Sequence, residues 1–129
     1  MKKITFFLLA AGFMVACQES LEERAEREAN DYTEKNCPLL MNEFQVMDSF
    51  TFDRPSHTFT YYYSLVGRMD TSSTILPDQQ RQALVSGVKN ATNLKAYKDE
   101  GYSFRYVYRS RKQPDMMYYD TTIKAEDYQ

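Results

Sequence analysis

Residues 102–111 read Tyr-Ser-Phe-Arg-Tyr-Val-Tyr-Arg-Ser-Arg, and this stretch decides the fold. Aromatic side chains recur at every second position through Tyr108, and mostly polar or charged side chains stand between them. Successive side chains of a β-strand point to opposite faces of the sheet. The stretch therefore predicts a strand with a buried aromatic face. Its opposite face carries Arg105, Arg109 and Arg111.

The same period of two marks three further strands, which cover residues 44–53, 57–66 and 117–123. In the first of them Val46 shares its parity with the phenylalanines, so we expect it on the buried face. Polar segments containing Pro55 and Pro114 connect the strands in pairs and have the composition of turns. The pattern predicts two hairpins.

Two segments have helical spacing instead. In residues 20–35, a capping box of Ser20 and Glu23 precedes a thin apolar stripe, whose members are Leu21, Ala25, Ala29 and Tyr32. A second helix begins at Pro77, which suits the first helical position. It breaks near residue 92, and Gly101 ends its short second part.

The expected fold class is α+β, with the element order α-β-β-α-β-β. Hairpins on either side of a helix favour two layers: a four-stranded, mainly antiparallel sheet and helices on one of its faces. The strand order stays open. Residues 17–129 have the length of a single domain.

The N-terminus has the layout of an export signal. Lys2 and Lys3 precede an apolar run at residues 4–13, and small residues then lead to Cys17. A helix that crosses a bilayer needs roughly 20 apolar residues. The run is too short for this, so the pattern favours a cleaved signal.

Met14-Val15-Ala16-Cys17 resembles the lipobox of bacterial lipoproteins, although Met14 stands where leucine is usual. The resemblance implies that residues 1–16 are a signal peptide, that cleavage occurs before Cys17, and that Cys17 carries acyl chains such as palmitate. These chains would anchor the domain to a membrane of the cell envelope. Gln18 after the cysteine favours the outer membrane over the inner one. An ordinary secretory signal is the alternative.

The use of Cys37 depends on that modification. If Cys17 is acylated, Cys37 is the remaining thiol, and we expect a small buried apolar side chain. If Cys17 is not acylated, a Cys17–Cys37 disulfide is the alternative.

Composition disfavours several classes of function. The formal net charge is −2 and becomes −4 without Lys2 and Lys3, which argues against a nucleic-acid partner. One histidine, His57, and one leftover thiol do not make a metal site. No nucleophile with a base, and no phosphate-binding glycine loop, is visible. We therefore expect no cofactor and no enzyme.

The exposed sheet face is the predicted contact surface. It would gather three arginines with tyrosines from other strands: Arg105, Arg109, Arg111, Tyr62 and Tyr118. Arginine beside tyrosine can hold an anion or stack on a planar or sugar ligand. The alternative is an ordinary polar face, with the arginines paired to acids such as Asp120.

The sequence thus predicts a membrane-anchored, non-catalytic binding module of the cell envelope. Its partner would be an envelope protein or an anionic ligand. The alternative function is inhibition of a hydrolase through a hairpin loop, for example residues 53–57.

Overall fold

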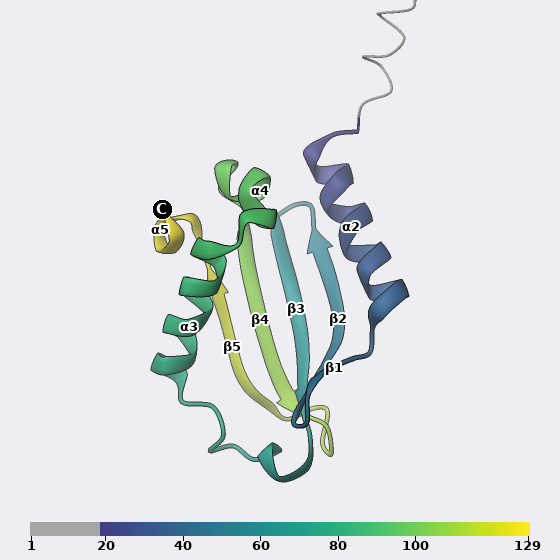
Figure 1. Cartoon of the computed structure of the whole chain (residues 1–129), viewed down its shortest axis with the longest axis vertical. Helices are drawn as coiled ribbons and strands as arrows, with labels where there is room; N and C mark the ends of the chain where they lie inside the picture. Colours follow the sequence, from purple (N-terminus) through teal and green to yellow (C-terminus); the bar gives the residue numbers. More distant parts are fainter. Residues whose placement is uncertain (1–18) are drawn as a thin grey trace, which may run out of the picture.

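The computed structural model describes residues 19–129 (Figure 1). The predicted signal peptide, Cys17 and Gln18 lie outside these residues. The elements follow one another as α2 (Leu21–Asn36), β1 (Leu39–Asn42), β2 (Gln45–Asp53), β3 (Thr58–Leu65), η1 (Gly67–Met69), α3 (Pro77–Asn90), η2 (Thr92–Leu94), α4 (Lys95–Asp99), β4 (Ser103–Ser110), β5 (Met117–Ile123) and α5 (Ala125–Tyr128).

The α+β class is confirmed, but the sheet has five strands rather than four and is mixed. Its strands lie in the order β1-β2-β3-β4-β5, and all neighbours are antiparallel except β3 and β4, which are parallel. The missed strand, β1, is only four residues long, too short to show a period. The parallel pair arises because the chain crosses through α3 between β3 and β4.

A bulge in β2 corrects one predicted orientation. The register shifts between Met47 and Ser49, so that Met47 lies opposite Tyr63 while Phe50 lies opposite Tyr61. A bulge inserts one extra residue and reverses the alternation beyond it. Met47 is therefore buried on the aromatic face. Val46, which was expected there, lies on the other face.

The helices cover one face of the sheet, as predicted. Buried residues of α2, α3 and α4 form one core cluster with the aromatic face of the strands. α2 packs along β2 and α3 along β5, so the two long helices lie towards opposite edges of the sheet (Figure 1). The predicted stripe of α2 is confirmed at Ala25 and Ala29, which are fully buried. Their small side chains let the helix approach the sheet closely.

Thr33 of α2 forms hydrogen bonds with the backbone of β2 at its unpaired edge. β1 pairs with β2 only as far as Met47, so the backbone of Phe50 faces no strand on that side. The Thr33 hydroxyl donates to the Phe50 carbonyl at 2.7 Å and accepts from its N–H at 2.8 Å. An unpaired strand edge needs such cover. One side chain here supplies both hydrogen bonds.

The predicted ends of the helices are largely confirmed. The Ser20 hydroxyl accepts from the backbone N–H of Glu23 at 3.1 Å, which caps α2. The second helical segment divides into α3 and α4, with η2 between them. Gly101 follows α4 with φ at +75°, a conformation that glycine adopts without steric strain.

Candidate functional site

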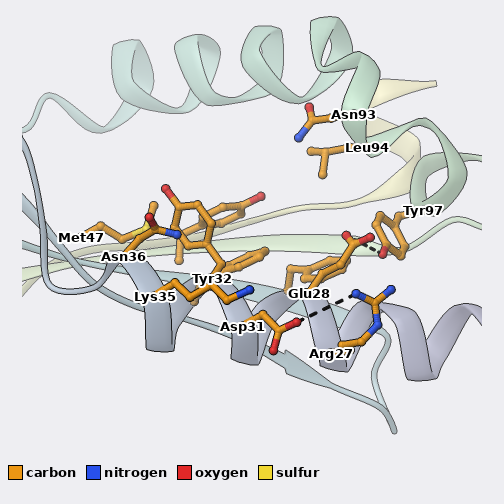
Figure 2. A pocket seen from close by; sticks show the side chains of 13 residues that line it. Arg27, Glu28, Asp31, Tyr32, Lys35, Asn36, Met47, Asn93, Leu94 and Tyr97 are labelled. Carbon is orange, nitrogen blue, oxygen red and sulfur yellow. Dashed lines mark hydrogen bonds and ion pairs between the residues drawn. The ribbon is translucent and has the colours of Figure 1, made fainter.

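A groove opens between α2 and the η2–α4 segment on the helical side of the sheet (Figure 2). Its volume is about 530 Å³. One wall comes from α2, the other from η2 and α4, and the floor from β2 and β3. The lining residues are Arg27, Glu28, Asp31, Tyr32, Lys35, Asn36, Met47, Phe50, Phe59, Tyr61, Asn93, Leu94 and Tyr97. The groove exists because α2 and α3 pack along opposite edges of the sheet.

The floor of the groove is aromatic. Phe50 stacks on Phe59 with ring centroids 5.2 Å apart and on Tyr61 at 4.5 Å. Tyr61 in turn stacks on Tyr106 at 4.6 Å. Burial raises the pKa of Tyr61 and, to about 12, that of Tyr106, so both hydroxyls stay neutral at physiological pH. The floor therefore presents uncharged, largely apolar surface.

Three of the four charged side chains on the α2 wall are paired with other charged groups of the domain. Arg27 binds Glu19 through two hydrogen bonds of 2.6 and 3.1 Å and lies 4.0 Å from Asp31. Glu28 accepts from Arg24 at 2.7 Å and from the Tyr97 hydroxyl at 2.9 Å. The fourth charged side chain, Lys35, forms no ion pair within residues 19–129 and is the one cation of this wall left for a ligand.

The opposite wall is short. Figure 2 shows Asn93 and Leu94 across the groove from the α2 side chains. Tyr32 is 37% exposed and packs edge-on against Phe50, with ring centroids 6.1 Å apart. An apolar group that entered between Tyr32 and Leu94 would meet the aromatic floor. The arrangement suits binding through shape and apolar contact.

Sequence reasoning missed this groove. Its lining comes from four separated segments that only tertiary packing brings together. The one available signal was Tyr32, an aromatic residue at the end of the apolar stripe of a charge-rich helix.

The structure places three of the five predicted contact residues together on the sheet face without helices. Arg105 forms a bidentate pair with Asp120 at 2.9 and 2.6 Å, the pairing that the alternative interpretation foresaw. The guanidinium of Arg109 lies over the Tyr62 ring, 5.5 Å from its centroid.

The other two predicted contact residues are engaged elsewhere. Arg111 follows the end of β4 and binds Asp48 at 3.2 Å. Tyr118 lies at the bulge of β5, and its hydroxyl donates to Asp70 at 2.7 Å.

The loop at residues 53–57 is tied to α2. Arg54 pairs with Glu26, and His57 Nε2 lies 2.9 Å from a carboxylate oxygen of Glu22. His57 also stacks on Tyr102 at 4.6 Å. The two longest side chains of the loop therefore bind the helix.

Cys37 is half-buried, and burial raises the pKa of its thiol, with the nearby Asp48 contributing. Such a thiol is a weak nucleophile. In residues 19–129, no group of three His, Cys, Asp or Glu side chains could hold a metal ion. Over the same residues, no helix is long and apolar enough to span a membrane.

The fold and groove define a class: a small α+β domain in which helices border a groove over one face of a five-stranded sheet. The chain belongs to the family described as "Domain of unknown function (DUF8479)", whose model matches residues 20–119. Among proteins of curated function, none matches this sequence.

Three solved structures share the fold. A candidate secreted protein of Pseudomonas aeruginosa is 17% identical, with a TM-score of 0.67 over 87% of this chain and 100% of its own. The type 2 secretion system pilotin EpsS of Vibrio vulnificus is 15% identical, with a TM-score of 0.63 over 84% of this chain and 92% of its own. The type II secretion system pilotin AspS of Vibrio cholerae is 19% identical, with a TM-score of 0.61 over 88% of this chain and 97% of its own.

Proposed function

We propose that this protein is a non-catalytic interaction module of the cell envelope. A lipid on Cys17 holds it at the outer membrane, and the groove beside α2 receives a segment of another envelope protein. The groove is the observation that carries the proposal. Its floor is aromatic, and Arg27 and Glu28 on its α2 wall are already paired.

The likeness to two pilotins supports the same class of function. Both belong to type II secretion systems, and both share this fold across most of their length. The lipobox-like Met14-Val15-Ala16-Cys17 agrees with a protein attached to a membrane. By analogy, the domain works by holding a partner near the membrane.

The groove specifies the partner's chemistry. Apolar side chains on one side of a helix or an extended segment would fill its volume of about 530 Å³. Each Å² of apolar area removed from water contributes about 25 cal/mol of favourable free energy. We expect one or two partner side chains to pack between Tyr32 and Leu94.

Site-specific crosslinking in intact cells tests the proposal. Benzoylphenylalanine replaces Tyr32, or, as the control, Leu76, which is 55% exposed and does not line the groove. We expect one envelope protein to crosslink at position 32 and not at position 76. The substitution Leu94→Glu should abolish the crosslink, whereas Leu76→Glu should leave it intact.

Leu76→Glu should keep the melting temperature of the parent chain. Leu94→Glu, whose side chain packs against the core cluster, should lower the melting temperature but keep the folded circular-dichroism spectrum, which separates loss of binding from loss of folding. Equal crosslinking from positions 32 and 76, or a crosslink that survives Leu94→Glu, would exclude the groove as the binding site.

A further inference from the structure

The sheet face without helices carries a row of side chains that crosses all five strands. The strand registers place each member directly opposite the next. Residues directly opposite one another in a sheet share a face. Neighbouring strands lie about 4.8 Å apart, so the row is about 19 Å long. From edge to edge it consists of Leu40, Val46, Ser64, Arg109 and Met117.

Arg109 is the uncompensated cation of this face. The two nearest arginines in the sequence are paired: Arg105 of β4 with Asp120, and Arg111, just after β4, with Asp48. Arg109 has no ion pair within residues 19–129, and its Nε is buried without a hydrogen-bond partner there. A partly desolvated charge without a counterion is unfavourable. The Tyr62 ring compensates for only part of that loss.

The hydroxyl next to Arg109 is already used. Ser64 is 4% exposed and donates to Asp48, whose other oxygen accepts from Arg111. That carboxylate therefore serves two donors, and Arg109 is neither of them. An anion from outside would compensate the charge of the half-buried Arg109 guanidinium.

The ends of the row are apolar and open to solvent. Leu40 is 65% exposed and Met117 is 51% exposed. Val46, between Leu40 and Ser64, is half-buried. A guanidinium with apolar side chains on both sides is complementary to a carboxylate with apolar neighbours on both sides.

We propose that this row binds an acidic segment of a partner protein, with one carboxylate at Arg109 and apolar side chains over Met117 on one side and over Val46 and Leu40 on the other. Arginine binds carboxylates through paired, charge-assisted hydrogen bonds. A bulk anionic membrane is disfavoured because lipid surfaces attract clusters of basic residues, whereas Arg105 and Arg111 beside Arg109 are already paired with carboxylates. The surface lies on the opposite side of the sheet from the groove, so the two sites can be occupied together.

The test uses the full chain in phosphatidylcholine nanodiscs and a fluorescent peptide, Leu-Ser-Leu-Ser-Asp-Ser-Leu. When extended, this peptide presents its leucines and aspartate on one side over about 20 Å, the length of the row. Fluorescence anisotropy should show saturable binding. We expect Arg109→Gln to weaken the binding at least about tenfold, in line with the loss of a charge-assisted pair. The peptide with asparagine in place of aspartate should bind the parent chain more weakly by a similar factor.

Matched control variants distinguish binding by the row from binding by other surface residues. Arg111→Gln removes a cation that Asp48 already pairs, and it should change the affinity less than about twofold. Leu40→Ser should weaken binding, whereas Leu76→Ser, an equally exposed leucine outside the row, should not. All four variants should melt with the parent chain, because these side chains are at least partly exposed.

Three results would overturn the proposal. The first is equal binding by the Arg109→Gln variant. The second is displacement of the peptide by inorganic phosphate, if phosphate binds the parent chain no more tightly than it binds the Arg109→Gln variant. That result would mean an adventitious ion only. The third is displacement by nanodiscs that contain phosphatidylglycerol, which would assign the row to lipid headgroups.

Discussion

At the scale of single residues, Asp70 shows how one buried carboxylate holds two loops together. It is 3% exposed and accepts from the Lys112 backbone N–H at 3.0 Å and from the Tyr118 hydroxyl at 2.7 Å. Burial acts to raise its pKa, but these hydrogen bonds, with one from Ser110, outweigh burial and lower the pKa to about 2. The loop after β3 is thereby fastened to the β4–β5 hairpin.

The lowered pKa predicts a specific pH dependence. A free aspartate has a pKa of about 3.9, so Asp70 stabilises the folded state above about pH 4. This contribution is lost as the pH falls towards 2. Asp70→Asn should reduce the free energy of unfolding at pH 6 by about 1.5–3 kcal/mol, the range for hydrogen bonds to a charged group. Urea unfolding at pH 6 and at pH 2.5 measures this free energy for the parent and the variant. If the difference between them were as large at pH 2.5 as at pH 6, the stabilising role of the Asp70 carboxylate would be contradicted.

At the scale of elements, the packing of α2 along β2 depends on a polar contact as well as on buried alanines. The Thr33 hydroxyl both donates to and accepts from the backbone of Phe50. Thr33→Val keeps the shape of the side chain but leaves two backbone groups without a partner. Its free energy of unfolding should fall by about 1–3 kcal/mol.

Thr33→Ser is the control for this contact because it keeps the hydroxyl and removes one methyl group, worth about 0.8 kcal/mol. Chemical denaturation of both variants measures the difference. If Thr33→Ser lowered the free energy of unfolding as much as Thr33→Val, apolar packing rather than hydrogen bonding would hold the helix at this edge.

At the scale of the whole molecule, the core cluster of the described residues runs from Leu21 to Tyr128. We expect the predicted signal and Cys17 to govern location rather than folding. Mass spectrometry of the protein from native membranes should find acyl chains on Cys17 and no peptide containing Lys2. The Cys17→Ser variant should no longer be found in the membrane fraction, and it should keep the melting temperature of the parent domain. An intact N-terminal peptide with Lys2 would rule out the cleaved, lipidated form.

The two proposed contact surfaces also belong to this scale. The groove depends on how α2 and the η2–α4 segment are spaced over the sheet, and the Arg109 row depends on the register of five strands. Neither surface lies within one element. Both lie on a domain whose first described helix, α2, begins at Leu21, four residues after the predicted anchor Cys17 in the sequence.

Local alternation and spacing predicted much of the fold. The aromatic period of residues 102–111 predicted β4, and the stripe of Ala25 and Ala29 predicted the buried side of α2, because side-chain direction repeats every two residues in a strand and every three to four in a helix. The same alternation correctly put Arg105, Arg109 and Tyr62 on one face.

The remaining features were decided by tertiary structure alone. β1 is too short to show a period, and the bulge that buries Met47 instead of Val46 depends on pairing with β3. The parallel β3–β4 pair, the groove, and the pairing of Arg105 and Arg111 while Arg109 stays unpaired all depend on contacts between distant segments. Local sequence determines which face of its own element a side chain occupies where the element is regular, as in β4. Only the assembled sheet determines which side chains that face meets, because neighbours across strands are set by register and crossover.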